Sequence, residues 1–191
     1  MSAAKARAIV IGASAGAIEA LAQILPALPV GYPLPVLVVV HVPPDRTNLL
    51  APLFKARCRL VVKEVEDKEP ILPGTIYFGA SDYHLLVEPD RSLSLSADEP
   101  VNYSRPSIDV LFESAADAYG GGLVGIILTG ANADGAEGLR AVVAAGGVAL
   151  VEDPARAFAP TMPAAALARS PGARAMSLDA LAAHLVALGA A

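Results

Sequence analysis

A serine, a histidine and an aspartate each stand shortly after an apolar run that has the composition of a buried β-strand. They are Ser14, His41 and Asp134. A histidine beside a serine can take the hydroxyl proton and so make the serine a nucleophile. An aspartate bonded to the imidazole fixes its tautomer and stabilises its charged form. These residue types therefore predict nucleophilic acyl transfer by a Ser-His-Asp triad.

Each of these residues also has an ordinary structural explanation. A serine before a helix is commonly an N-cap, a histidine after a valine run can be a satisfied core residue, and Asp134-Gly135 is a common turn pair. Catalysis is favoured because three complementary residue types fall at the ends of three strands. The helix expected after Ser14 would add free N–H groups, which can hold an oxyanion.

Two motif-based alternatives fit less well. Gly12-x-Ser14-x-Gly16 matches the nucleophile elbow of α/β-hydrolases, but in that fold the acid precedes the histidine along the chain. The same turn is similar to a dinucleotide-binding turn, yet the G-x-G-x-x-G fingerprint is not met and no acidic residue follows the second strand. We therefore predict no cofactor. A non-catalytic binding domain would leave His41 and Asp134 unexplained.

The elements that must position these residues follow from hydrophobic periodicity. Runs rich in Val, Ile and Leu alternate with segments whose apolar residues recur at helical spacing. This order predicts an α/β fold with a doubly wound, mostly parallel sheet flanked by helices, whose carboxyl edge carries the function. Short runs separated by turn residues predict an antiparallel hairpin region near residues 75–96. The other expected strands are 8–11, 36–40, 60–62, 124–128 and 147–151, and the expected helices are 18–28, 49–54, 108–119, 136–145, 162–169 and 178–188.

Composition limits the class of protein. The 191 residues include 14 Lys and Arg against 19 Asp and Glu, and a net charge of −5 argues against a nucleic-acid or anionic-membrane surface. Hydrophobic residues make up 54%, but no apolar run approaches the roughly 20 residues of a membrane span. The single cysteine, Cys58, excludes an internal disulfide and a Cys₄ zinc site. We expect one cytoplasmic domain over residues 5–188, with no metal, no nucleic-acid partner and no membrane insertion.

Several separated motifs resemble the catalytic domain of protein-glutamate methylesterase, which demethylates receptors in bacterial chemotaxis. They occur in the family's order and span nearly the whole chain. They are I-G-A-S-A-G at 11–16, H-V-P-P at 41–44, E-D-K-E-P-I-L-P-G at 66–74, R-P-S-I-D-V-L-F at 105–112, I-L-T-G-A-N-A-D-G-A-E-G at 127–138 and M-P at 162–163. The family's nucleophile, histidine and aspartate fall on Ser14, His41 and Asp134.

The resemblance implies a serine carboxylesterase that hydrolyses glutamate γ-methyl esters on cytoplasmic helices of chemoreceptors, releases methanol and also deamidates glutamine. The alternatives are an esterase for another small methyl ester and a catalytically weak binding domain that retains the triad. Arg105 is expected either to orient a loop or touch the substrate, or else to pair with a buried carboxylate such as Asp109. The oxyanion and substrate-binding residues expected from the resemblance are Ala15, Gly16, Ala131, Asn132, Arg105 and Met162.

The chain departs from the family pattern at the nucleophile turn and before the aspartate. The family usually has a small hydroxyl residue and two glycines where this chain has Ala15, Gly16 and Ala17. It usually reads T-G-M-G-x-D-G where this chain has Ala131 and Asn132 for Met and Gly. These departures bear on rate and substrate preference rather than on reaction type. A receiver domain usually precedes the family's catalytic domain. The chain begins at the catalytic domain, so we expect either a part of a longer protein or a stand-alone enzyme that a separate protein regulates.

Overall fold

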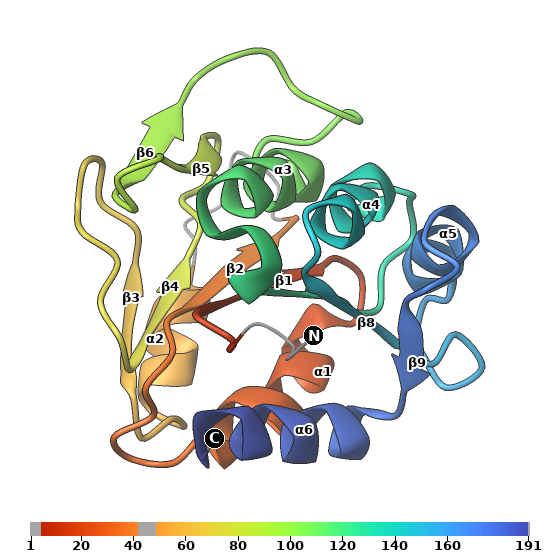
Figure 1. Ribbon diagram of the computed structural model, residues 1–191, viewed down its shortest axis with the longest axis horizontal. Helices are drawn as coiled ribbons and strands as arrows, with labels where there is room; N and C mark the ends of the chain where they lie inside the picture. The colour runs from red at the N-terminus through yellow and green to blue at the C-terminus, as the bar shows by residue number, and fades with distance from the viewer. Residues whose placement is uncertain (1–4, 42–48, 191) are drawn as a thin grey trace.

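The computed structural model describes residues 5–41 and 49–190, in which seven strands form one parallel sheet (Figure 1). The strand order is β3-β4-β2-β1-β7-β8-β9. The strands are β1 (Ala8–Ala13), β2 (Val36–Val40), β3 (Val61–Glu64), β4 (Thr75–Phe78), β7 (Leu123–Ile127), β8 (Val148–Glu152) and β9 (Arg174–Met176). The predicted doubly wound α/β fold is confirmed.

Helices cover both faces of the sheet because side chains of a strand point alternately to either side. Ile9 and Ile11 of β1 pack into one core, while Ala8 and Val10 pack into the other. Figure 1 shows the helices of the two layers above and below the sheet. The first core includes residues of α1 (Ala17–Ile24), α2 (Leu50–Lys55) and α6 (Leu178–Ala190), and the second includes residues of α3 (Ile108–Tyr119), α4 (Ala136–Ala144) and α5 (Thr161–Arg169).

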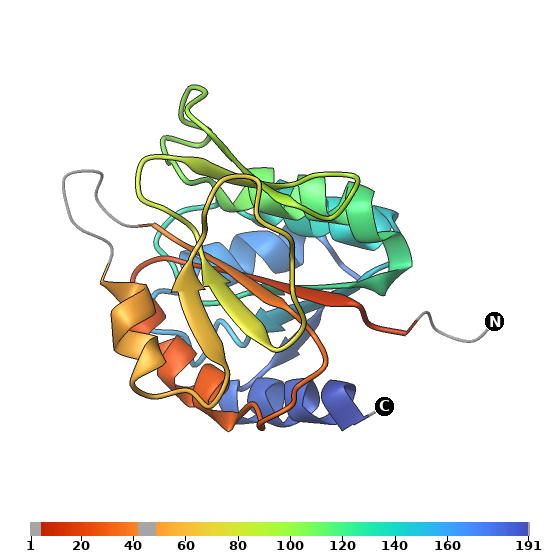
Figure 2. The ribbon, with the colours of Figure 1, turned by 90° about the vertical axis from the view of Figure 1, so that its left-hand side faces the viewer.

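The hairpin region is smaller than its sequence pattern indicates. Strands β5 (His84–Val87) and β6 (Leu93–Ser96) form an antiparallel pair beside α3, outside the main sheet (Figure 2). The Val87 N–H donates to Ser114 Oγ of α3 over 3.1 Å. Residues 75–78, which the turn pattern groups with the hairpin, instead form β4 between β3 and β2. All four of its residues are buried, as expected of a strand covered on both faces.

The strand order places the candidate site at one point on the sheet edge. β1 lies between β2 and β7. After β1 the chain adds β2, β3 and β4 on one side of β1, and it later adds β7, β8 and β9 on the other side. Ligands of open α/β sheets bind outside the carboxyl ends of the strands at such a switch point. The loops that follow these three strands carry Ser14, His41 and Asp134.

Candidate active site

Strand pairing brings the serine and the histidine together. Ala13 of β1 pairs with Val40 of β2, so the next residues, Ser14 and His41, leave neighbouring strands side by side. The His41 N–H donates to the Ala13 carbonyl over 3.2 Å, and the Ser14 N–H donates to the Thr129 carbonyl over 2.9 Å. The ladder thus continues to the two residues at which the chemistry is expected.

Asp134 lies on one side of the imidazole and is held as an anion. Its Oδ2 is 2.7 Å from His41 Nε2 and accepts from the Ile108 N–H over 2.7 Å. Its Oδ1 accepts from Ser107 Oγ and from Asn102 Nδ2, each over 2.8 Å. The carboxylate therefore caps the start of α3, where the helix dipole favours negative charge. Burial raises the pKa of Asp134, but these hydrogen bonds outweigh burial and hold that pKa below its ordinary value.

The second imidazole nitrogen is occupied by another side chain. Asn132 Nδ2 lies 3.3 Å from His41 Nδ1. Within the described ranges, no hydrogen bond joins the Ser14 hydroxyl to His41. The structure therefore brings His41 and Asp134 into contact and places Ser14 next to them. Asn132 lies at Nδ1, the ring nitrogen that would have to accept the serine proton.

The turn after Ser14 has a geometry that only glycine fits. Gly16 has φ +82° and precedes α1, and a Cβ there would lie 2.8 Å from Phe158 Cβ. Thr129 Oγ1 donates to the Ala15 carbonyl over 2.8 Å, which ties this turn to the loop after β7. The turn therefore depends on contacts from two other loops.

Backbone donors are available at the expected oxyanion positions. The N–H groups of Ala15, Gly16, Ala131 and Asn132 make no hydrogen bond to any other described residue. Ala15 and Gly16 stand at the start of α1, where free N–H groups can hold a negative charge. The structure thus leaves free N–H donors in the turn after Ser14 and in the loop after β7, the kind of donor that an oxyanion requires.

Met162 lies behind the loop and not at its surface. Its side chain is fully buried, and a Cβ on Gly130 would lie 2.5 Å from Met162 Cε. The Met162 N–H donates to the Gly130 carbonyl over 2.9 Å. The position expected to bind substrate therefore supports the loop from within the core.

Arg105 organises the loop over residues 97–105. Its Nε and Nη2 donate to Asp82 Oδ1 over 3.0 and 2.7 Å, and its Nη1 donates to the carbonyls of Ala97 and Asp98. The suggested pairing with Asp109 is wrong. Asp109 accepts instead from Asn102 and from the Gly138 N–H. The loop-orienting alternative is the one that the contacts of Arg105 favour.

Sequence reasoning missed the donors that hold Asp134 and the histidine that holds their loop. His84, fully enclosed, has Nε2 2.9 Å from the Glu99 carbonyl, and its Nδ1 accepts from the Ser107 N–H over 3.1 Å. Ser107 carried a signal, since it directly precedes a helical pattern. Asn102 carried none, because its contact with Asp134 spans 32 positions and needs a backbone φ of +52°.

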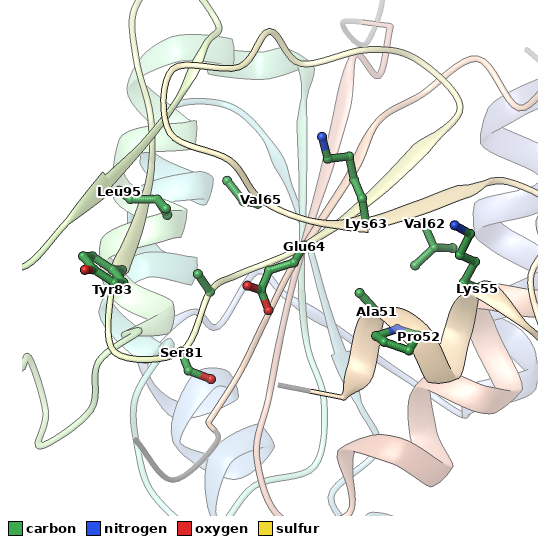
Figure 3. A pocket seen from close by; sticks show the side chains of 11 residues that line it. Ala51, Pro52, Lys55, Val62, Lys63, Glu64, Val65, Ser81, Tyr83 and Leu95 are labelled. Atoms are coloured by element: carbon green, nitrogen blue, oxygen red, sulfur yellow. The ribbon is translucent and has the colours of Figure 1, made fainter. Parts of the chain in front are cut away.

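A large open cavity lies apart from these residues. It has a volume of about 920 Å³ and opens between α2, β3 and the β5–β6 hairpin. Figure 3 shows Lys63 and Glu64 of β3 in it, with Tyr83 on the hairpin side and Lys55 on the α2 side. None of the three triad candidates lines it. The candidate catalytic residues therefore lie at the strand ends and not in this cavity.

A serine beside a histidine and a buried aspartate, at the carboxyl edge of a parallel α/β sheet, is the arrangement of serine hydrolases. The sequence profile described as CheB methylesterase matches residues 9–185. The chain belongs to the CheB methylesterase family, a family of hydrolases, and the predicted resemblance is confirmed.

Relatives and a solved structure agree with this assignment. A protein from Leptospira interrogans, provisionally named protein-glutamate methylesterase/protein-glutamine glutaminase, is 43% identical over 92% of this chain and 91% of its own length. A Bordetella parapertussis protein of the same name is 39% identical over 84% of this chain, which spans only 47% of that relative. The Thermotoga maritima CheB methylesterase catalytic domain matches with a TM-score of 0.91 and 30% identity, over 97% of this chain and all of that structure.

Membrane-spanning helices and clusters of metal-binding side chains are both absent from the described residues. None of the helices in residues 5–41 and 49–190 is long and apolar enough to cross a membrane. The same residues contain no group of three or more His, Cys, Asp or Glu side chains arranged to hold a metal ion.

Proposed function

We propose that this protein is a cytoplasmic protein-glutamate methylesterase that acts on methylated glutamates of chemoreceptor helices, with Ser14, His41 and Asp134 as its catalytic residues. Family membership supports the reaction. The observation that carries the residue assignment is the 2.7 Å contact between His41 Nε2 and Asp134 Oδ2 beside Ser14. We also propose a separate regulatory protein as a partner.

Acylation follows from the positions of the three side chains. Ser14 Oγ attacks the ester carbonyl carbon, and its proton passes to His41 Nδ1. Asp134 at Nε2 stabilises the imidazolium that forms. N–H groups of the two turns, from Ala15 and Gly16 and from Ala131 and Asn132, bind the oxyanion. When the tetrahedral intermediate collapses, the bond to the methoxy oxygen breaks and the imidazolium protonates it, which releases methanol.

Deacylation uses the same groups in reverse. Water attacks the acyl-enzyme and gives its proton to His41 Nδ1, and the Ser14 oxygen leaves and recovers that proton. The product is the glutamate carboxylate. A glutamine amide follows the same two steps with ammonia as the leaving group.

Exposed aromatic side chains beside the site support a macromolecular substrate. Phe158 contacts the turn at Gly16 and is 81% exposed, and Tyr103, next to Asn102, is fully exposed. Large apolar side chains held in water near a catalytic turn commonly mark a contact surface. A receptor helix would cover them, whereas a small ester would not.

The test is methanol release from methylated chemoreceptors. We expect Ser14→Ala to lower turnover by about 10³-fold or more. The matched control is Ser177→Ala, because Ser177 Oγ accepts from Ala180 at the start of α6. That variant should lose only the stability of a cap, about 1 kcal/mol, and keep its turnover. A Ser14 variant that keeps most of the wild-type turnover would mean another nucleophile. A kcat/KM for small methyl esters equal to or above that for methylated receptors would overturn the substrate assignment.

A further inference from the structure

The orientation of the Asn132 side chain is fixed by the backbone. Asn132 Oδ1 accepts from the Asp134 N–H over 3.0 Å, and an N–H group can only donate. The atom at this position is therefore the amide oxygen. The amide nitrogen faces His41 Nδ1, at 3.3 Å.

This orientation defines the protonation of the imidazole. Ionised Asp134 only accepts, so His41 Nε2 carries a proton and donates it to Oδ2. The Asn132 amide nitrogen only donates, so Nδ1 must present its lone pair. Both neighbours thus select the same species, a neutral imidazole with its proton on Nε2.

The same contact competes with catalysis. A ring nitrogen has one lone pair in the ring plane, so Nδ1 cannot fully accept from Asn132 and from the Ser14 hydroxyl at once. After proton transfer, Nδ1–H would point at the donor Nδ2. The amide must therefore leave Nδ1 before the serine attacks.

We propose that the Asn132 side chain is a positioning residue that holds His41 neutral and correctly oriented in the free enzyme, and that yields Nδ1 to Ser14 when the ester binds. This inference rests on the proposed esterase function and extends it. The titratable groups that the described residues place around the imidazole are Asp134, in contact, and Asp109, joined to Asp134 through Asn102.

The first test observes the imidazole directly in the substrate-free protein. Nitrogen-15 NMR of labelled histidine at neutral pH should show His41 with a protonated Nε2 and an unprotonated Nδ1. Assignment uses the resonance that is lost in His41→Gln. A proton on Nδ1 in the wild-type protein would overturn the proposal, because the amide could then not donate to that nitrogen.

The second test measures hydrolysis of a small γ-methyl glutamate ester against pH. Asn132→Asp keeps an oxygen for the Asp134 N–H but places a carboxylate at Nδ1, which favours the imidazolium. We expect kcat at pH 7 to fall by about tenfold or more and to recover as the pH is raised. Asn132→Ala removes the competing donor, so we expect kcat to rise by up to about fivefold, the equivalent of one neutral hydrogen bond.

The control is Ala133→Asp, which adds the same charge at the neighbouring exposed position without the contact to His41. Its kcat should stay within about threefold of the wild-type value. Equal losses in Asn132→Asp and Asn132→Ala at every pH would overturn the proposal, because they would show a purely structural role for the side chain. If the wild-type protein hydrolyses no ester while NMR shows the expected tautomer, the esterase function fails and the Asn132 contact stands.

Discussion

Asn102 stands between two buried carboxylates, and its amide donates to Asp134 over 2.8 Å and to Asp109 over 2.7 Å. Asn102→Gly removes the amide and tolerates the φ of +52°. A hydrogen bond to a charged group contributes about 1.5–3 kcal/mol. We expect kcat for a small ester to fall by about tenfold with little change in KM. A control is Ser92→Ala, whose hydroxyl bonds exposed Asp90. An unchanged kcat would show that Asp134 needs no help from Asn102.

The charge on Asp134 also links stability to pH. Its pKa lies below the ordinary 3.8, so its ionised form stabilises the folded chain above that value and the contribution is lost as the pH falls through the folded pKa. We expect Asp134→Asn to be less stable than wild type at pH 7 by about 2 kcal/mol, since the new amide faces donors. The difference in the free energy of unfolding between the two proteins should become smaller near pH 3. Urea midpoints at both pH values measure this difference, and a difference that does not change with pH would contradict an ionised Asp134 in the folded chain.

At the scale of elements, the turn between β1 and α1 depends on Gly16. Alanine there meets a φ of +82° and Phe158 at 2.8 Å. Gly31 is the matched control, with φ +77° and nothing within 4 Å of a Cβ. We expect Gly31→Ala to cost about 1–2 kcal/mol and to leave activity intact. Gly16→Ala should cost more and reduce kcat. Equal unfolding midpoints and rates for the two variants would show that the Phe158 contact does not matter.

The loop between β8 and α5 provides the aromatic part of the proposed contact surface. Phe158→Ser should raise KM for methylated receptors by about tenfold and leave KM for a small ester unchanged, because only a large partner can cover the ring. Val30→Ser is the control: Val30 is 78% exposed in the connection between α1 and β2. If Phe158→Ser raises KM equally for methylated receptors and for the small ester, the ring supports the turn and does not bind the receptor.

At the scale of the whole molecule, two cores share one sheet. Residues of β1 belong to both cores, so neither layer keeps its packing without the other. We therefore expect residues 5–188 to unfold as one cooperative unit. Far-UV circular dichroism and fluorescence of the five tyrosines should give coincident urea transitions. Separate transitions would indicate two independently folding parts.

Apolar runs predicted the sheet and the three strand ends of the site because both follow from local composition. The same reasoning placed residues 75–78 in the hairpin, since turn residues flank buried parallel strands and hairpin strands alike. Asn102 and the side-chain contact of Asn132 could not be predicted. Both depend on loop conformations that bring residues far apart in the sequence together. Sequence periodicity carries no information on those distances.

The pairing of Ala13 with Val40 has an evolutionary consequence. The distance between Ser14 and His41 is set by the backbone hydrogen bonds between β1 and β2 and does not depend on the loops that follow. A single-residue insertion within β1 or β2 would turn one of the two side chains to the opposite face of the sheet. Changes in the length of the connection between the strands would leave the pair in place. Descendants of this protein can therefore exchange whole loops, and with them their substrates. The lengths of β1 and β2 and the register between them must stay the same.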